Sequence, residues 1–322
     1  MDYESFLAEW RDEHAHVLVH TSGSTGTPKP LWVEKRRMEA SARATCRFLG
    51  LKAGDVALLC LPLDYIAGKM MVVRALTCGL RLVSVPPNGH PLAQCPEAID
   101  FAAMVPMQVY DSLQVSEERE RLRRIRHLII GGGAIDDTLA EALKTFENGV
   151  WSTYGMTETL SHIALRRLSG PDATEWYTPF EGVTLSLTAE GCLAIDAPAL
   201  ADGQLVTNDI AELLADGRFR ILGRLDNTIC TGGVKVQAEA VEALLSHHLA
   251  APFCITKRRD EKYGEVVVLL TESTDTGALK AICERVLPKY WQPRHIISIG
   301  RIPLTPTGKI ARKEAMRLAA LA

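Results

Sequence analysis

Two short segments near opposite ends of the chain combine residue types that suit phosphate chemistry. The first, residues 20–29, reads HTSGSTGTPK and follows a short apolar stretch, while the second, residues 303–310, reads PLTPTGKI. In the first segment glycines let backbone amides approach anionic oxygens, hydroxyls add donors, and Lys29 supplies a positive charge. Together with Lys309 in the second segment, this pattern predicts an enzyme that consumes ATP to activate a carboxylate.

The first segment differs from the two most familiar phosphate-binding motifs. Its spacing is not that of a Walker loop, because Pro28 stands where the second glycine would fall, and it contains no G-x-G-x-x-G. A polar surface turn is the alternative, although a run this dense in donors favours phosphate binding. The expected contributors are Thr21, Ser22, Gly23, Ser24, Thr25, Gly26 and Lys29.

A further polar segment, residues 154–159, reads YGMTET and follows an apolar strand. Side chains at the carboxyl end of such a strand lie where α/β sheets bind ligands. Glu158 could hold Mg²⁺ on phosphates and Thr157 could donate to one of these phosphates, although the segment could equally be a plain turn.

Two charged residues later in the chain are further candidates. Asp209 is expected to begin a strand and could accept both hydroxyls of a ribose or cap a turn. Arg224 is expected to face solvent by default.

The composition is that of a globular protein. The chain has 322 residues and a formal net charge of -3, with 47% hydrophobic and 23% charged residues. This length suggests two domains, and the small charge predicts no nucleic-acid partner. No apolar run is long enough for membrane insertion, and the eight cysteines show neither C-x-x-C spacing nor a metal pattern with histidine. We therefore expect a cytoplasmic protein with reduced, mostly buried thiols.

Short apolar strands alternate with helical patterns through the first half of the chain. Strands are expected at residues 17–19, 56–61, 81–85, 127–130 and 150–154, and helices at 36–49 and 138–147. This alternation is typical of an α/β layered domain with a largely parallel sheet. Short strands with glycine turns then predict a smaller β-rich subdomain, at residues 183–187, 192–195 and 210–222. The segment after residue 226 predicts a compact α+β module.

Seven motifs of this chain occur in the order found in the adenylate-forming acyl-CoA synthetase superfamily, which the chain resembles over essentially its whole length. The motifs are residues 21–29, 131–134, 154–159, 207–212, 223–226, 231–236 and 303–312. The resemblance implies a large N-terminal α/β domain with a β-rich subdomain and a small mobile C-terminal α+β domain. It places the ATP- and acyl-substrate-binding domain at residues 1–224, and the mobile domain with the catalytic lysine at residues 225–322.

The family pattern implies that ATP, Mg²⁺ and coenzyme A are used with a carboxylic acid, through an acyl-adenylate that a thiol then attacks. Residues 21–29 would hold the departing phosphates. Thr157 would contact the α-phosphate and Glu158 the Mg²⁺, while Asp209 and Arg224 would hold the ribose. The residues expected to flank the adenine are Gly131, Gly132, Gly133, Ala134, Tyr154, Gly155 and Met156.

The same pattern makes Lys309 a mobile lysine that bridges the substrate carboxylate and the α-phosphate during adenylation only. Two anions meet in that step, so a cation between them lowers the repulsion where it is greatest. Asp226 would be the hinge about which the small domain rotates. Gly232 and Gly233 would line a coenzyme A tunnel, because a bare backbone leaves room for a pantetheine arm.

The acyl substrate is suggested by residues 61–74. Relatives usually have an aromatic residue followed by His in this segment, whereas Asp64 and Tyr65 stand here, so a gate involving Tyr65 would be built differently. Within the superfamily the segment and Arg74 look most like the o-succinylbenzoate-CoA ligases of menaquinone biosynthesis. That substrate is an aromatic dicarboxylate whose second carboxylate needs a cation. Arg74, or else Lys69, is the candidate, unless these cations face solvent.

Three alternatives stay open at this point. Another aryl- or short-chain acyl-CoA ligase would share the mechanism, and an enzyme that loads a carrier protein would differ in its thiol. A catalytically inactive nucleotide-binding scaffold is the third, disfavoured because Glu158, Asp209, Arg224 and Lys309 are all of the required type. Relatives have a long region before the phosphate loop, which here begins 20 residues into the chain, so a homodimer could complete the domain.

Overall fold

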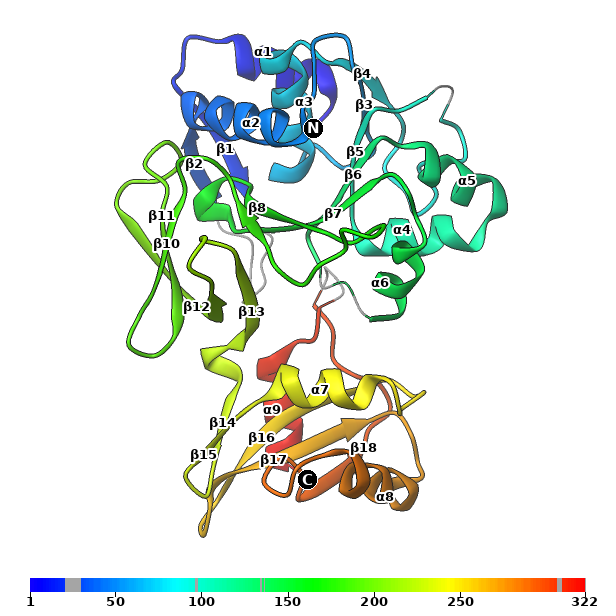
Figure 1. The fold of residues 1–322 in the computed structure, drawn as a ribbon, viewed down its shortest axis with the longest axis vertical. Helices are drawn as coiled ribbons and strands as arrows, with labels where there is room; N and C mark the ends of the chain where they lie inside the picture. Colours follow the sequence, from blue (N-terminus) through cyan, green and yellow to red (C-terminus); the bar gives the residue numbers. More distant parts are fainter. Residues whose placement is uncertain (21–29, 96–97, 134, 136, 306–308, 322) are drawn as a thin grey trace. The chain divides into compact units, whose positions relative to one another are not determined.

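The structure is a computed structural model, and it describes residues 1–20, 30–95, 98–133, 135, 137–305 and 309–321. The chain divides into two compact units (Figure 1). The first comprises Met1–Leu185, Ile195–Leu205 and Leu214–Phe219, and the second comprises Ser186–Ala194, Val206–Leu213 and Arg220–Ala322. Because the units interleave between residues 186 and 220, the domain boundary at residues 224–225 stays a prediction.

A seven-stranded sheet forms the centre of the first unit. Its order is β4-β3-β5-β6-β7-β8-β9; the strands from β4 to β7 are parallel, and the β7–β8 and β8–β9 pairs are antiparallel. The strands are β3 (Val56–Leu59), β4 (Arg81–Ser84), β5 (Phe101–Met104), β6 (His127–Ile130), β7 (Gly149–Gly155), β8 (His162–Arg167) and β9 (Thr178–Pro179). This largely parallel sheet confirms the predicted α/β class.

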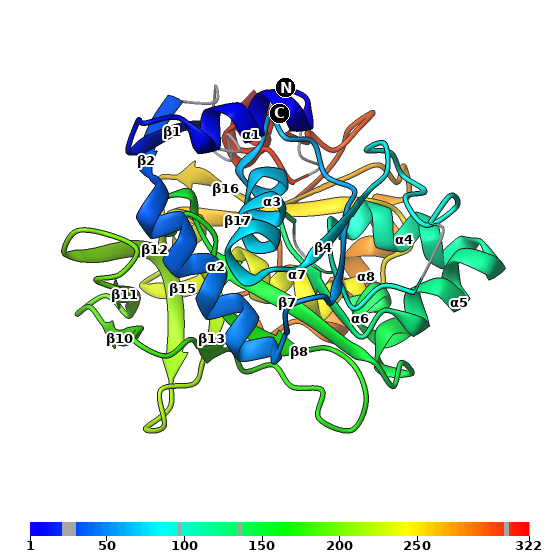
Figure 2. The same ribbon diagram turned by 90° about the horizontal axis from the view of Figure 1, so that it is seen from above.

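Helices cover both faces of this sheet (Figure 2). They are α1 (Tyr3–Arg11), α2 (Lys35–Leu49), α3 (Ile66–Cys78), α4 (Pro106–Gln114), α5 (Ser116–Arg124) and α6 (Asp137–Lys144). Helices α1 to α3 pack in one core with Leu59 and Phe101, whereas α4 to α6 pack in another with Leu58 and Ala102. Neighbouring strand residues thus enter opposite cores, as the two-residue period of a strand requires.

Residues 17–19 form a strand as predicted, but it does not join the parallel sheet. β1 (His16–His20) pairs antiparallel with β2 (Pro30–Glu34), from His16 opposite Glu34 to His20 opposite Pro30. The prediction went wrong because a three-residue apolar run indicates a strand without specifying its partner. The two ends of this hairpin lead into the predicted phosphate loop, Thr21 to Lys29, which lies outside the described residues.

A four-stranded sheet of order β10-β11-β12-β13 confirms the β-rich segment and contributes residues to both units. Its strands are β10 (Thr184–Leu187), β11 (Cys192–Asp196), β12 (Gln204–Leu213) and β13 (Phe219–Arg224). Because β12 starts at Gln204, Asp209 lies inside the strand and not at its beginning. Sequence analysis placed this start too late, because polar residues such as Asn208 have low strand propensity and pairing with neighbouring strands overrides it.

The rest of the second unit is an α+β module, as predicted. Its sheet has the order β15-β14-β17-β16, with β18 parallel to β17, and it packs α7 and α8 in one core and α9 in another. The elements are η2 (Leu225–Asn227), β14 (Thr228–Thr231), β15 (Val234–Gln237), α7 (Ala238–Ser246), β16 (Phe253–Asp260), β17 (Gly264–Thr271), α8 (Thr276–Val286), β18 (His295–Ser298) and α9 (Arg312–Leu321). No helix in the described part of the chain has the length and apolar character needed to cross a membrane.

Candidate active site

The YGMTET motif leaves the central sheet at the carboxyl end of β7, where a ligand was expected. A short helical turn, η1 (Thr157–Thr159), follows, and the Thr159 hydroxyl accepts from the Met156 amide at 3.0 Å and donates to the Ser161 carbonyl at 2.7 Å. The next residue, Leu160, has φ of 65°, a conformation that costs a leucine about 1 kcal/mol or more. The strained turn is thus held by hydrogen bonds, which suits a segment that positions Glu158.

Tyr154 and Gly155 are closely packed at this strand end. A Cβ on Gly155 would lie 2.3 Å from the Ser161 carbonyl oxygen, so glycine is required there. The Tyr154 ring lies 5.8 Å from that of Tyr177 and 5.1 Å from that of Phe219. Sequence analysis missed the last two residues, because no motif connects them to residue 154. An aromatic cluster beside the motif is compatible with the predicted adenine contact.

The glycine motif at residues 131–133 follows β6, the parallel neighbour of β7. The carboxyl ends of β6 and β7 therefore bring this motif and the YGMTET motif to the same edge of the sheet. Ala134, also predicted to flank the adenine, lies outside the described residues.

Arg74 is buried on α3, with 2% of its surface exposed. Its Nη2 donates to Ser161 Oγ at 2.9 Å and Nη1 to Met71 Sδ at 3.8 Å, while Nε has no hydrogen-bond partner. No carboxylate of the described residues pairs with it. Burial lowers the pKa of Arg74 to about 10, so the guanidinium stays charged at neutral pH. An unpaired buried cation costs several kcal/mol, and an anion bound there would recover part of that cost.

A chain of hydrogen bonds orients the Ser161 hydroxyl. Thr45 Oγ1 donates to the Ser41 carbonyl at 3.1 Å, so it accepts from His162 Nε2 at 3.1 Å. With that proton on Nε2, His162 Nδ1 accepts from Ser161 Oγ at 3.2 Å, and the Ser161 oxygen accepts from Arg74. Sequence analysis missed these positioning residues. The available signal was His162, a histidine close behind the YGMTET motif.

His162 should make stability depend on pH. Burial, and then the nearby Arg74, lowers the pKa of His162 well below 6.5. The unfolded chain therefore binds this proton more readily, so the free energy of unfolding falls as the pH drops below 6.5, by about 1.4 kcal/mol per pH unit. In His162→Gln, whose amide can still donate to Thr45, this contribution is absent. Urea unfolding of both proteins between about pH 7 and pH 5 measures it; a constant difference between the two across this range would contradict the assignment.

Lys69 is also buried on α3, but its charge is compensated. Its Nζ donates to the Leu18 carbonyl at 2.7 Å, lies 3.6 Å from Glu9 Oε2 and is 5.2 Å from the centre of the Phe6 ring. Facing solvent is therefore wrong for both candidate cations, since Lys69 is only 3% exposed. The contacts of Lys69 leave Arg74 as the better candidate for a substrate carboxylate.

Tyr65, the third residue predicted at the acyl site, immediately precedes α3 and is 49% exposed. Its neighbour Asp64 accepts a hydrogen bond from the amino group of Met1 at 2.9 Å. The structure does not bring Tyr65 into contact with Arg74, and its role at the acyl site stays a prediction.

In the second unit, the structure brings Asp209 and Arg224 together. Arg224 Nη1 donates to Asp209 Oδ1 at 3.0 Å, and its Nη2 donates to Asp226 Oδ2 at 3.0 Å. Although burial acts in the opposite direction, the carboxylates of Asp226 and Asp209 hold the pKa of Arg224 above its usual value. Arg224 is thus a paired residue at the end of β13 and not an isolated solvated charge.

Lys309 is hydrogen-bonded to Thr305 in the second unit. The Thr305 amide donates to the Lys309 carbonyl at 2.7 Å, and the Lys309 amide donates to Thr305 Oγ1 at 3.1 Å. Partial removal from water, and then Arg224, lowers the pKa of Lys309, while Asp209 acts to raise it. Lys309 therefore lies within electrostatic range of the two residues predicted to hold the ribose.

Arg312 anchors the segment that follows Lys309. Its guanidinium forms a two-pronged ion pair with Glu242 of α7, at 2.7 and 2.6 Å, and donates to the Ile255 carbonyl at 2.8 Å. Such planar pairing fixes orientation as well as distance. The start of α9, three residues beyond Lys309, is thereby anchored to α7 and β16.

Gly232 and Gly233 form the turn between β14 and β15. Their φ angles of +57° and +82° are disfavoured for residues with a side chain. A Cβ on Gly232 would lie 3.3 Å from the Tyr263 ring and 3.9 Å from that of Tyr290. The Arg294 guanidinium lies 3.8 Å from the centre of the Tyr263 ring. The predicted tunnel glycines thus adjoin an aromatic and cationic cluster that sequence analysis missed.

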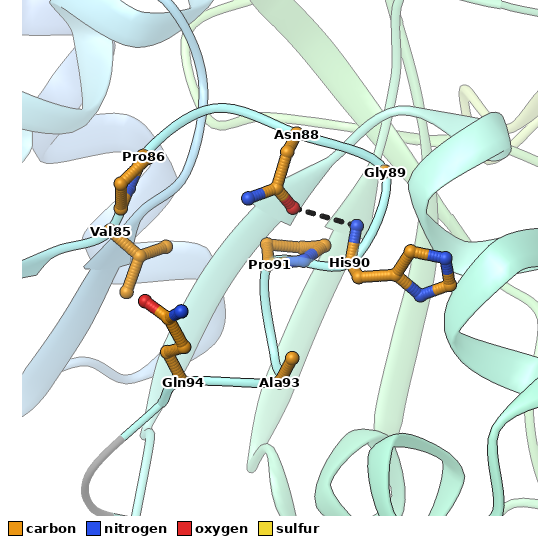
Figure 3. Close-up of a pocket in the computed structure, with 8 residues that line it drawn as sticks. All are labelled: Val85, Pro86, Asn88, Gly89, His90, Pro91, Ala93 and Gln94. Carbon is orange, nitrogen blue, oxygen red and sulfur yellow. Dashed lines mark hydrogen bonds between the residues drawn. The ribbon is translucent and has the colours of Figure 1, made fainter.

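A small pocket of about 270 Å³ lies elsewhere in the first unit, in the loop after β4 (Figure 3). Eight residues between Val85 and Gln94 line it, and His90 is the titratable one among them. The His90 amide donates to Asn88 Oδ1 at 2.7 Å, and its ring contacts Glu118 at 2.9 Å. None of the predicted site residues lines this pocket, and we assign it no catalytic role.

Glu158 is suited to hold Mg²⁺. Mg²⁺ usually keeps several waters and is bound through one or two carboxylates together with substrate phosphates. Within the described residues no group of three or more His, Cys, Asp or Glu side chains could form a closed metal site. A single carboxylate just beyond the carboxyl end of β7 fits this open mode of binding.

The described architecture is that of adenylate-forming enzymes: a mainly parallel sheet with the glycine and YGMTET motifs at its strand ends, and an α+β module that carries Lys309. Residues 5–187 match the family of AMP-binding enzymes, and the chain belongs to this family. It is an AMP-forming acid-thiol ligase, a class that uses ATP with Mg²⁺ and takes coenzyme A as co-substrate.

Known proteins similar to the chain include both sequences and solved structures. It is 34% identical to an acyl-CoA synthetase (AMP-forming)/AMP-acid ligase II-like protein from Dyadobacter fermentans, over 98% of this chain and 92% of that chain, with a TM-score of 0.68. It is 27% identical to a 2-succinylbenzoate–CoA ligase of Bacillus cereus, over 98% of this chain and 72% of the relative. The o-succinylbenzoate CoA synthetase of Bacillus subtilis, solved with the acyl-adenylate intermediate, shares the fold with a TM-score of 0.77 at 22% identity, over 92% of this chain and 68% of that chain.

Proposed function

We propose that this protein activates an aromatic dicarboxylate of the o-succinylbenzoate type with ATP and transfers the acyl group to coenzyme A, as a step of menaquinone biosynthesis. The observation that carries the substrate class is Arg74, a buried guanidinium whose Nε is unpartnered and which pairs with no described carboxylate. A second substrate carboxylate would supply the missing anion. The names of the Bacillus relatives support the same substrate.

In the proposed reaction, one oxygen of the substrate carboxylate attacks the α-phosphorus of ATP and pyrophosphate leaves. Lys309 lowers the repulsion between these two anions, and Thr157 donates to the α-phosphate. Asp209 accepts from the ribose hydroxyls, and its ion pair with Arg224 fixes its orientation. Glu158 would hold Mg²⁺, which supplies positive charge to the phosphates.

In the second half-reaction the thiol of coenzyme A attacks the acyl carbon, loses its proton, and AMP leaves. Gly232 and Gly233 are proposed to line the path of the pantetheine arm, because their turn carries no side chain. The adjoining Tyr263 and Arg294 provide an aromatic face and a positive charge, which suit a nucleotide-bearing thiol. A carrier-protein thiol is the alternative acceptor, and a homodimer stays a prediction.

The hinge at Asp226 can be tested through backbone restriction. Proline at this position fixes φ, so Asp226→Pro should hinder domain rotation and slow one half-reaction at least about tenfold more than the other. Asp226→Ala is the matched control, since it removes the contact with Arg224 but leaves the backbone free. Separate assays of adenylate formation and of thioester formation provide the measurement. Equal effects of the two substitutions would mean that Asp226 is not the pivot.

The substrate class is tested by comparing two acids that differ by one group. Pyrophosphate release is measured with o-succinylbenzoate and with the same aromatic keto acid in which the carboxylate that is not activated is replaced by a methyl group. We expect kcat/KM to favour the dicarboxylate by at least about tenfold, the effect of one buried ion pair of modest strength. Equal values for the two acids would favour another aryl- or short-chain acyl-CoA ligase.

A further inference from the structure

The hydrogen bonds that lead from Thr45 to Arg74 have a defined direction. Thr45 donates its only hydroxyl proton to the Ser41 carbonyl, so it can only accept a proton from His162. His162 Nε2 must then carry the ring proton, and Nδ1 is left as the acceptor for the Ser161 hydroxyl at 3.2 Å. Ser161 thus gives its proton to His162 and contacts Arg74 Nη2 through its oxygen, at 2.9 Å.

Burial protects this direction from competition by water. Thr45 is fully buried and His162 is 6% exposed, with the Phe180 ring edge-on against the imidazole at 5.4 Å. Burial, and then the nearby Arg74, hold the pKa of His162 well below 6.5, so the neutral ring has a single proton. The side chains come from three elements, α2, α3 and the start of β8. The fold therefore sets the tautomer of His162.

The consequence for Arg74 is a fixed orientation of its guanidinium. Nη2 donates to the Ser161 oxygen, Nη1 donates to Met71 Sδ at 3.8 Å, and Nε is unpartnered. The guanidinium also lies 6.0 Å from the centre of the Phe101 ring. If the Ser161 proton pointed toward Arg74, a donor would face a cation and the bond from Nη2 would be lost. The direction of the hydrogen bonds therefore keeps the guanidinium in one position.

We propose that His162 is a positioning residue which acts through Ser161 on Arg74, and that it thereby determines how strongly the enzyme prefers a dicarboxylate. The inference rests on the proposed function, in which the second carboxylate of the substrate binds Arg74. His162 contributes an acceptor at Nδ1, and Thr45 contributes by keeping the ring proton on Nε2. The affinity for the dicarboxylate then depends on an acceptor at the position of Nδ1.

The proton position is tested without any substrate. Proton–nitrogen correlation spectra of protein that carries ¹⁵N-labelled histidine distinguish the two neutral tautomers, and the signals of His162 are those missing from His162→Gln. We expect the proton on Nε2 at neutral pH. Thr45→Val removes the acceptor for that proton and should shift the ring toward the other tautomer. A proton on Nδ1 in the unaltered protein would overturn the proposal.

Two substitutions of His162 separate positioning from stability. The asparagine amide lies as many bonds from Cα as Nδ1 does, and the glutamine amide lies as many as Nε2 does. His162→Asn therefore keeps an acceptor for Ser161, whereas His162→Gln keeps only the donor to Thr45. We expect His162→Gln to raise KM for the dicarboxylate about tenfold with kcat changed by about twofold or less, and His162→Asn to raise KM by about threefold or less.

Ser112→Ala is the matched control, because Ser112 is fully buried and donates to Glu118 at 3.0 Å, outside the proposed site. It should change KM by about twofold or less for both the dicarboxylate and the analogue with a methyl group in place of the second carboxylate. Equal KM values in His162→Gln and His162→Asn, in an enzyme that prefers the dicarboxylate, would overturn the inference and keep the proposed substrate. An unaltered enzyme without that preference would overturn both.

Discussion

We expect Lys309→Ala to lose acyl-adenylate formation while keeping thioester formation from a pre-made acyl-adenylate. In the first half-reaction the ammonium is proposed to lie between two anions, and removing one such electrostatic contact from a catalytic site costs about two to three orders of magnitude in rate. In the second half-reaction the nucleophile is a thiol, and the repulsion between carboxylate and phosphate is no longer present. Each half-reaction is followed alone, by pyrophosphate exchange and by consumption of synthetic acyl-adenylate.

Lys313→Ala is the matched control for this experiment, because Lys313 is an exposed lysine on the adjoining helix α9. It should change neither half-reaction by more than about twofold. Equal losses of both half-reactions in Lys309→Ala would refute a lysine that acts in adenylation only.

Arg74→Met should separate stability from activity. Because Arg74 pairs with no described carboxylate, an apolar side chain of similar length should leave the melting temperature unchanged or raise it. The same substitution should lower kcat/KM for the dicarboxylate by about one to three orders of magnitude, since a bound carboxylate would lose its cation. A monocarboxylate of the same shape should lose about threefold or less. Parallel losses for both acids would remove Arg74 from the acyl site.

Lys69→Met is the contrasting variant on the same helix. Lys69 donates to the Leu18 carbonyl and pairs with Glu9, so its removal leaves the Leu18 carbonyl without this donor and the Glu9 carboxylate without its countercharge. We expect a loss of about 2 kcal/mol in the free energy of unfolding, without preference between the two acids. Thermal unfolding and the same pair of kinetic assays measure both variants.

The class of fold and most of the proposed site residues could be predicted because they form ordered motifs. The apolar runs at residues 56–61 and 127–130 form parallel strands, and the YGMTET motif begins in the last two residues of β7, at the expected edge of the sheet. The pairing partner of a strand was harder to predict than the strand itself. The strand at residues 17–19 pairs with β2, and Asp209 lies within β12, because pairing depends on segments that are distant in sequence.

Motif analysis could not predict the contacts that set the charge environment and the orientation of the candidate site residues. The difference between Lys69 and Arg74 depends on Glu9, which lies 60 residues before Lys69 and outside every motif. The hydrogen bond of His162 to Thr45 spans 117 residues. Such contacts arise only when α1, α2 and α3 pack on the sheet, so no local spacing indicates them.

The most direct test of the central claim is mass spectrometry of the products formed from ATP, Mg²⁺, coenzyme A and a panel of carboxylic acids that includes o-succinylbenzoate. The account predicts the coenzyme A thioester of o-succinylbenzoate together with AMP. Another thioester in its place would keep the ligase mechanism and replace the proposed substrate. The absence of any thioester and of AMP with every acid would contradict the account and favour a nucleotide-binding scaffold.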